Sequence, residues 1–130
     1  MTAAENKKIV ENAFAQWLAG DSGAPFRLLA KNVHWTVIGT TPISAAYKSK
    51  REFLTGAGPL MDHLATPIKP ELVDITAVDD KVILEFKAHA VAKNSTAYDQ
   101  VYCWVMRMEN GEVVEGKAYL DTDLLVRVLK

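Results

Sequence analysis

The sequence has very little cysteine, no long apolar run and almost no net charge. Its one cysteine, Cys103, excludes an internal disulfide and a cysteine-based zinc site. No stretch approaches the roughly 20 apolar residues that a membrane-spanning helix needs, and the polar start MTAAENKK is unlike a secretory signal. A formal net charge of −1 gives no electrostatic reason to expect nucleic acid or an anionic membrane as a partner. We therefore expect a cytoplasmic protein with no nucleic-acid and no membrane partner.

Motifs for metal, phosphate and nucleophilic chemistry are also missing. No cluster of His, Asp and Glu has the spacing of metal ligands, and no glycine-rich loop is suited to cradle a phosphate. The sequence shows no Ser-His-Asp or Cys-His set of the kind used in nucleophilic catalysis. The sequence therefore predicts neither a metal site nor a cofactor.

The ordinary composition that remains is typical of one globular domain. The chain has 130 residues, of which 49% are hydrophobic and 24% charged. A chain of this length can bury roughly two-thirds of its unfolded surface without disulfides or metals. It has no internal repeat, low-complexity segment or linker, so we expect a single domain over residues 1–130.

The most informative stretch is Ala97–Asp121, which reads as two long β-strands joined by Asn110-Gly111. Asn-Gly between alternating strands is the strongest short-range signal for a hairpin. Because side chains alternate across a strand, one face of the first strand is large and aromatic and the other is small and apolar. The large face carries Tyr98, Gln100, Tyr102, Trp104, Met106 and Met108, and the small face carries Val101, Cys103 and Val105.

The other predicted elements follow from periodicity, capping and turn residues. Thr2 and Glu5 form a capping box, and an apolar stripe of helical period then runs to Leu18. Ser49 and Glu52 form a second capping box, and the helix that they open is expected to be interrupted at Gly56, Gly58 and Pro59 and to end by Pro67 and Pro70. The remaining predictions are a short helix over Pro25–Ala30, strands over Val33–Ile38, Ile43–Tyr47, Glu71–Val78 and Lys81–Ala92, and a C-terminal tail over Asp123–Lys130.

Helices early in the chain and antiparallel strands late are typical of α+β folds. We expect a strongly curved antiparallel (mixed) sheet wrapped around three N-terminal helices, forming a cone with an internal cavity. Strand parity then predicts the residues of the cavity wall. They are Trp17, Trp35, Val37, Phe86, Ala88, Tyr98, Gln100, Tyr102, Trp104 and Leu120.

This arrangement resembles the SnoaL-like and ketosteroid isomerase-like members of the nuclear transport factor 2-like superfamily. The resemblance covers nearly the whole chain. It rests on the first helix ending in Ala19-Gly20-Asp21, on Val33-His34-Trp35, on Gly39 to Pro42, and on the segments Val105-Met106-Arg107-Met108, Asn110-Gly111 and Ala118-Tyr119-Leu120-Asp121. It implies the cone fold, usually dimeric, with a deep ligand cavity.

The catalytic groups of two well-understood branches are absent. At the positions that match the carboxylate base, the acidic oxyanion donor and the tyrosine of ketosteroid isomerases, this chain has Val37, Trp104 and Ala13–Phe14. At the positions that match the catalytic set of limonene epoxide hydrolases it has Phe86, Ala88, Ala118, Ile38 and Thr40. The resemblance therefore supports a ligand cavity without either of these chemistries.

Several side chains remain as candidates for recognition or catalysis. Tyr98, Gln100 and Tyr102 either orient a polar group of an apolar ligand or form a self-satisfied core network. The three tryptophans either stack on a flat ligand or are simply core residues. Tyr102, His63 and Asp121 are the candidate catalytic residues, although His63 also suits a helix end and Asp121 a structural anchor.

Two classes of function fit these observations. One is an enzyme of the isomerase, cyclase or hydratase kind, acting on an apolar carbonyl-bearing ligand. The alternative is a non-catalytic carrier, sensor or accessory subunit with the same cavity, binding a small apolar or aromatic molecule. In both cases the small apolar face of Val101, Cys103 and Val105 is expected to form a homodimer interface.

Overall fold

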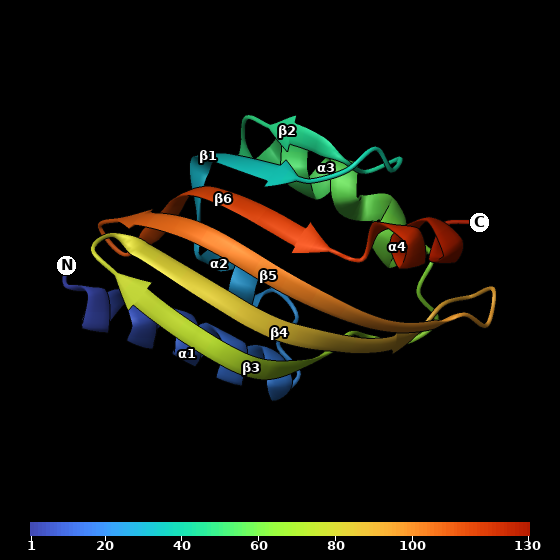
Figure 1. Cartoon of the computed structure of the whole chain (residues 1–130), viewed down its shortest axis with the longest axis horizontal. Coiled ribbons are helices and arrows are strands. Elements are labelled where there is room, and N and C mark those ends of the chain that lie inside the picture. Colours follow the sequence, from blue (N-terminus) through green and yellow to red (C-terminus); the bar gives the residue numbers. More distant parts are fainter.

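The computed structural model describes residues 1–130 as an α+β fold (Figure 1). The helices, in chain order, are α1 (Ala3–Leu18), α2 (Ala24–Arg27), α3 (Lys50–Asp62) and α4 (Thr122–Val128). The strands are β1 (Leu29–Val37), β2 (Ala45–Tyr47), β3 (Lys69–Val78), β4 (Lys81–Val91), β5 (Ala97–Glu109) and β6 (Glu112–Leu120). Three helices precede the four long strands of the second half of the chain, as predicted.

The six strands form one mixed sheet in the order β2-β1-β6-β5-β4-β3. All neighbours are antiparallel except β1 and β6, which run parallel and bring the first and last strands of the chain together. The predicted hairpin between β5 and β6 is confirmed: Asn110 and Gly111 have φ values of 50° and 81°. Positive φ at both residues is the backbone of a type I′ turn, which Asn-Gly adopts with little strain.

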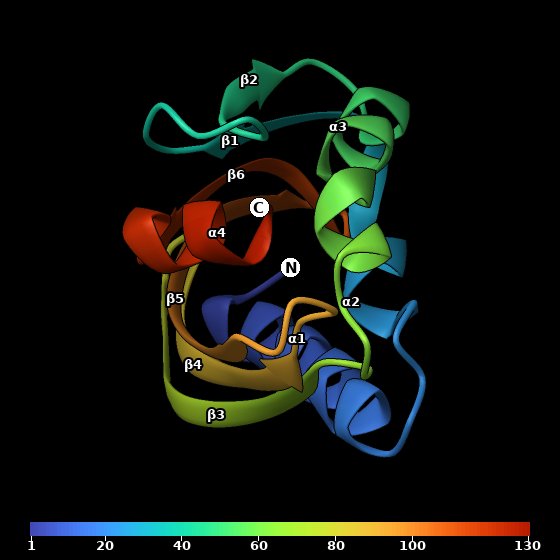
Figure 2. The ribbon, with the colours of Figure 1, turned by 90° about the vertical axis from the view of Figure 1, so that its right-hand side faces the viewer.

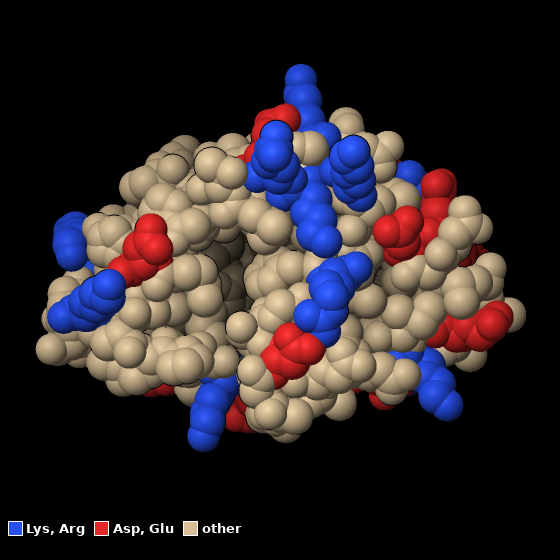
Figure 3. Space-filling view, turned by 180° about the vertical axis from the view of Figure 1, so that it is seen from behind, with Lys and Arg blue, Asp and Glu red and all other residues tan.

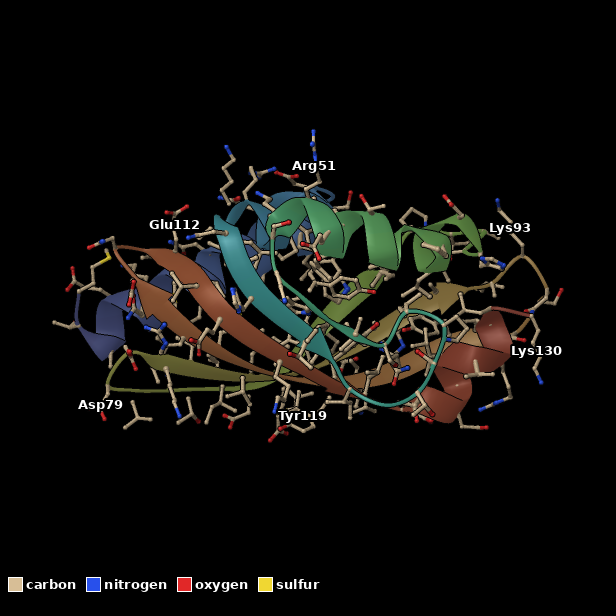
Figure 4. The ribbon with its side chains drawn as sticks, turned by 90° about the horizontal axis from the view of Figure 1, so that it is seen from above. Arg51, Asp79, Lys93, Glu112, Tyr119 and Lys130 are labelled. Carbon is tan, nitrogen blue, oxygen red and sulfur yellow. The ribbon has the colours of Figure 1, made fainter.

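The helices α1, α2 and α3 lie on one side of the sheet (Figure 4). Helix α1 packs against β3 and β4, whereas α3 packs against β1 and β2 at the other edge (Figure 2). Tyr119 projects from the opposite, outer face of the sheet, while Arg51 projects on the helix side (Figure 4). No helix in the structure combines the length and the apolar character that crossing a bilayer requires.

The two predicted capping boxes have different outcomes. At α1 both bonds are present, since the Thr2 hydroxyl accepts from the Glu5 amide at 3.1 Å and the Glu5 carboxylate accepts from the Thr2 amide at 2.9 Å. At α3 the Ser49 hydroxyl accepts from the Glu52 amide at 3.1 Å, but the reciprocal bond is absent. Ser49 is therefore a simple N-cap, and Glu52 remains free in solvent.

Two boundaries early in the chain differ from prediction. The second helix ends at Arg27, not Ala30, and the following strand begins at Leu29, not Val33. The reason is tertiary pairing: Leu29 lies opposite Val113 of β6, and this long-range partner draws the segment into the sheet. A register shift between Leu29 and His34 then restores the alignment with β6.

The predicted break in α3 is wrong. The helix runs without interruption through Gly56, Gly58 and Pro59. Proline removes one amide hydrogen, which leaves the carbonyl of Thr55 without its usual helical partner. Both Pro59 and Thr55 are exposed, so water can satisfy that carbonyl. Gly56 is required for packing instead, because a Cβ there would lie 2.3 Å from the Tyr47 ring.

The predicted tail over Asp123–Lys130 is also wrong, because most of it forms α4. Leu124, Leu125 and Val128 are buried, and the helix packs on β5. The Asp121 carboxylate caps the helix by accepting from the Leu124 amide at 3.1 Å. The anchoring role expected for Asp121 is thus observed, at the start of a helix that was not predicted.

The alternation predicted for β5 is confirmed. Its large face is buried from Tyr98 to Met108, while the residues between are exposed or half-buried. Inward residues of β4 alternate in the same way, with Leu84, Phe86 and Ala88 having no exposed surface. These two strands therefore supply much of the core, and α1 packs against β4 and its neighbour β3.

Candidate functional site

An apolar pocket lies on the helix side of the sheet, with a cavity volume of about 500 Å³. Figure 3 shows that side of the molecule, where a deep hollow is bordered mainly by uncharged residues and Lys and Arg side chains gather to one side of it. Of the 22 lining residues, 18 are hydrophobic. The strands supply Trp35, Val37, Phe86, Tyr102, Trp104, Ala118 and Leu120.

Helix α3 and the segment after it form the wall opposite the strands. The residues that they contribute are Phe53, Leu54, Ala57, Gly58, Leu60, Met61, Leu64, Ala65, Thr66, Pro67 and Ile68. Leu54 and Met61 are also exposed to solvent, so they lie at the rim of the pocket. The sequence shows the apolar stripe of α3, but nothing in a single helix indicates that this stripe faces a cavity.

Aromatic rings build the inner wall around Phe86. The Phe86 ring stacks on Tyr102 at a centroid distance of 4.8 Å and meets Trp104 edge-on at 4.8 Å. Trp35 meets Trp104 edge-on at 5.2 Å. Such stacked and edge-to-face pairs stabilise an arrangement beyond the burial of their area, so this wall is held in one geometry.

Gly116 determines where Trp35 lies. A Cβ at Gly116, on the neighbouring strand β6, would lie 2.2 Å from the Trp35 ring. The indole therefore lies across the backbone of β6, in the space that any other residue would fill. Its other face stacks on Phe53 of α3 at 5.3 Å, which joins the strand wall to the helix wall.

The Tyr102 phenol is the one titratable side chain that borders the pocket. Its hydroxyl lies 2.6 Å from the hydroxyl of Tyr98, a fully buried residue that does not border the pocket. Burial raises the pKa of Tyr98, and it raises that of Tyr102 well above the ordinary value. Both phenols therefore stay protonated at neutral pH, and they are hydrogen-bonding groups rather than bases.

Two buried donors of the pocket wall have no hydrogen-bond acceptor. They are the indole nitrogens Nε1 of Trp35 and Trp104. Buried polar groups are usually paired, so each exception calls for an explanation.

Seven of the ten predicted wall residues border the pocket: Trp17, Trp35, Val37, Phe86, Tyr102, Trp104 and Leu120. Ala88, Tyr98 and Gln100 are buried on the predicted face but lie beyond the pocket. Helix α4 packs on β5 at this end. Whether any of the ten binds a ligand stays a prediction.

Gln100 has a structural role that the sequence did not reveal. Its amide nitrogen donates to the Asp121 carbonyl at 2.9 Å, and its amide oxygen accepts from the Asp121 and Val101 amides at 2.8 and 3.0 Å. The side chain thereby fastens the start of α4 to β5. These three bonds use all of its hydrogen-bonding capacity except one amide hydrogen.

Of the three candidate catalytic residues, Tyr102 alone borders the pocket. His63 is the C-cap of α3, and its Nδ1 lies 2.6 Å from the Pro59 carbonyl, to which a protonated Nδ1 donates. Asp121 is occupied in capping α4. His63 and Asp121 therefore have structural positions, and a catalytic role for any of the three stays a prediction.

The outer face of the sheet holds the other predicted surface. Val101 is 59% exposed, while Cys103 and Val105 are half-buried. Burial, followed by the nearby Glu85 carboxylate, raises the pKa of the Cys103 thiol, so it remains protonated at neutral pH. Nowhere in the chain do three or more His, Cys, Asp or Glu side chains come together in a way that could hold a metal ion.

The sequence matches no protein-family model and no curated protein. Solved structures do match the fold. Bal32a, from a soil-derived mobile gene cassette, superimposes with a TM-score of 0.81 at 22% identity over 98% of each chain. A nuclear transport factor 2-like protein from Burkholderia thailandensis has a TM-score of 0.80 at 19% identity, over 100% of this chain and 98% of the other. TerC, co-crystallised with polyporic acid, has a TM-score of 0.75 at 12% identity, over 95% and 97%.

These identities are too low to transfer an activity, but the superpositions cover nearly the whole of both chains. The chain therefore has the nuclear transport factor 2-like fold, in common with the ketosteroid isomerase-like and SnoaL-like proteins that its sequence resembles.

Proposed function

We propose that this protein is a small-molecule-binding domain whose sheet and helices close as a cone around an apolar, carbonyl-bearing ligand. One observation carries the proposal: an apolar pocket of about 500 Å³ with a phenol in its wall. Ligand sites are typically concave and mainly apolar, of about 300–1,000 Å³, with a few polar groups that orient the ligand. Burial of the ligand's apolar surface gives most of the affinity, and a hydrogen bond from Tyr102 orients the ligand.

The fold neighbours are consistent with this proposal. TerC was crystallised with polyporic acid, and a ketosteroid isomerase-like protein from Catenulispora acidiphila was crystallised with trimethylamine. Proteins of this fold thus include some that accommodate small organic molecules. The ligand of this chain has to suit its own wall, which is richer in aromatic than in polar groups.

Binding without catalysis is the better-supported version of the proposal. Proton transfer near neutral pH needs a group whose pKa lies near the working pH. Burial raises the pKa of Tyr102 well above its ordinary value, so its phenol cannot act as a base near neutral pH. No carboxylate or histidine borders the pocket. Catalysis of the isomerase, cyclase or hydratase kind would have to use Tyr102 as a hydrogen-bond donor only, to a carbonyl that is polarised and then attacked by water or by another part of the substrate.

Native mass spectrometry of protein purified without denaturants tests the proposal. We expect an adduct of small-molecule mass that disappears on unfolding, and saturable binding of the apolar dye Nile red to ligand-free protein. Finding only the apoprotein mass together with no binding of Nile red would refute it. Incubating the released compound with the protein then separates carrier from enzyme, since only an enzyme returns a different mass.

We predict no appreciable isomerisation of 3-oxo-Δ5-steroids. That reaction needs a carboxylate to move a proton from carbon and an acid to hold the dienolate, and the matching positions are Val37 and Trp104. Losing one oxyanion donor costs on the order of a hundredfold or more in rate, and here the base is missing too. In a steady-state assay with 5-androstene-3,17-dione, the rate should equal the buffer rate. Turnover above that rate would show that another residue acts as the base.

We also propose a homodimer through the outer face that carries Val101, Cys103 and Val105. Val101 and Tyr119 are 59% and 42% exposed there, and a two-fold dimer is the commonest way to cover such an apolar surface. Replacing Val101 with glutamate should convert dimers to monomers in sedimentation velocity, because two carboxylates would be buried near the two-fold axis.

Leu18→Glu is the matched control for the dimer. Leu18 is 65% exposed at the end of α1, on the helix side of the molecule, and its replacement should leave sedimentation unchanged. If Val101→Glu sediments like the wild type, the interface lies elsewhere.

A further inference from the structure

We propose that the pocket selects neutral ligands whose polar group is a hydrogen-bond acceptor, such as a ketone, aldehyde, ester or quinone oxygen. The Tyr102 hydroxyl donates to that oxygen, and Tyr98 is the positioning residue that orients the Tyr102 hydrogen toward the pocket. This inference rests on the proposed ligand-binding function and adds the class of ligand and the role of Tyr98.

Counting hydrogens assigns the direction of the Tyr98–Tyr102 bond. Each phenol has a single hydrogen to donate. Tyr98 has no exposed surface, and its hydroxyl lies 2.6 Å from the Tyr102 oxygen. The Gln100 side chain also acts on Tyr98 as a hydrogen-bond donor, which partly offsets the rise in the Tyr98 pKa that burial causes. It cannot accept, because both lone pairs of its amide oxygen are taken by the Asp121 and Val101 amides. The Tyr102 oxygen is therefore the acceptor that remains for the Tyr98 hydrogen. A buried hydroxyl that does not donate loses the free energy of a hydrogen bond. Tyr98 therefore donates to Tyr102.

The Tyr102 hydrogen is then left without a protein acceptor. Tyr98 is the one hydrogen-bond partner of the Tyr102 hydroxyl, and its hydrogen already occupies the bond between them. Tyr102 borders the pocket, whereas Tyr98 does not. The hydroxyl hydrogen that is free in the Tyr98–Tyr102 pair is consequently that of Tyr102, the residue that borders the pocket.

The other unpaired polar groups of the wall are also hydrogen-bond donors. Trp35 and Trp104 each have an indole N–H without an acceptor, and indole nitrogen can only donate. The third buried group without a partner is an acceptor, the Asn6 side-chain oxygen, but Asn6 lies on α1 and does not border the pocket. Both indole nitrogens are covered by neighbouring atoms, so we assign the bond to the ligand to the Tyr102 hydroxyl. The two buried groups of the wall that lack a hydrogen-bond partner are thus both donors.

The charge of the pocket favours a neutral oxygen over a carboxylate. No Lys, Arg or His borders it, and burying an unpaired carboxylate costs far more free energy than one neutral hydrogen bond returns. Basic side chains gather beside the hollow on the surface, outside the lining (Figure 3). A protonated amine is disfavoured as well, because no carboxylate borders the pocket to balance its charge.

Displacement of Nile red by three matched probes tests the inference. The probes are 2-acetylnaphthalene, 2-isopropenylnaphthalene, in which CH2 replaces the carbonyl oxygen, and 2-naphthoate. We expect the ketone to bind about three- to tenfold more tightly than the alkene, the range of one net hydrogen bond, and naphthoate to bind more weakly than both. Equal affinity of ketone and alkene would overturn the inference while leaving the proposed function intact. Failure of Nile red and all the probes to bind would instead remove the proposed function.

Two phenylalanine variants separate the roles of the tyrosines. Tyr102→Phe should abolish the preference for the ketone and leave the alkene affinity unchanged, which also shows that the pocket is still formed. Tyr98→Phe should reduce the preference by about two- to threefold, because a hydroxyl that accepts one hydrogen bond is a stronger donor in the next. If Tyr102 donated to Tyr98 instead, Tyr98→Phe would free the Tyr102 hydrogen and increase the preference, which would overturn the assigned direction.

Tyr47→Phe is the matched control for both variants. Its hydroxyl donates to the Ile43 carbonyl at 2.6 Å and does not border the pocket. The preference for the ketone should be the same in this variant as in the wild type. A change as large as that of Tyr102→Phe would show that the preference depends on general stability and would overturn the role given to Tyr102.

Discussion

Replacing Phe86 with alanine is expected to lower the free energy of unfolding by about 3–5 kcal/mol, the range measured for large aromatic residues in cores. Phe86 has no exposed surface and lies at the centre of the aromatic wall. Its ring contacts Phe14, Trp17, Tyr102 and Trp104 at centroid distances of 4.8 to 5.8 Å. The substitution removes all four contacts and leaves a cavity between α1 and the sheet. Urea denaturation followed by circular dichroism measures the loss.

The control for this variant is Phe26→Ala. Phe26 also borders the pocket, but it is half-buried and its one aromatic neighbour, Phe53, lies 6.2 Å away. Its loss should therefore cost much less free energy. If Phe86→Ala cost less than about 1 kcal/mol, the neighbouring rings would have to move into the vacated space, and the aromatic wall could not be the rigid element that the pocket is built on.

Replacing Ala57 with tryptophan is expected to weaken the binding of Nile red by about a hundredfold or more, a loss of about 2.7 kcal/mol or more in binding free energy. Ala57 is half-buried on the side of α3 that borders the pocket. An indole at this position occupies the volume that a ligand needs. Because space is already present there, the substitution should leave the unfolding free energy nearly unchanged. Fluorescence titration with Nile red measures the affinity.

Thr55→Trp is the matched control, since Thr55 lies on the same helix but is exposed and does not border the pocket. The added surface is the same, yet the affinity for Nile red should stay within about twofold of the wild type. Equal weakening by both substitutions would indicate that the dye binds the outside of α3. Unchanged affinity in both would place the binding site elsewhere in the molecule.

Local patterns in the sequence predicted the parts of the fold that depend on neighbouring residues. The capping box of Thr2 and Glu5, the type I′ turn at Asn110-Gly111 and the buried face of β5 all follow from backbone geometry within a few residues. The same alternation predicted most of the strand side of the pocket, including Tyr102 and Trp104. A strand's parity is a local property, so one sequence is enough to derive it.

The extent of the pocket depended on contacts between distant segments. Gln100 and Tyr98 have the predicted parity, yet they lie beyond the pocket, where α4 packs on β5 and Gln100 is fastened to Asp121. The wall opposite the strands comes from α3, whose apolar stripe could equally well have packed against a closed core. The start of β1 at Leu29 likewise depends on its pairing with β6, more than 80 residues away in the sequence.

The sequence by itself therefore determined which side chains share a face, because alternation along a strand and period along a helix are set by the local backbone. Only the tertiary structure decided which of those faces enclose space, because a cavity exists where elements distant in the sequence meet without filling the volume between them. The pairing of the Tyr98 and Tyr102 hydroxyls and the unpaired indoles of Trp35 and Trp104 belong to this second class. Hydrogen-bond partners depend on distances and angles that no one-dimensional pattern specifies.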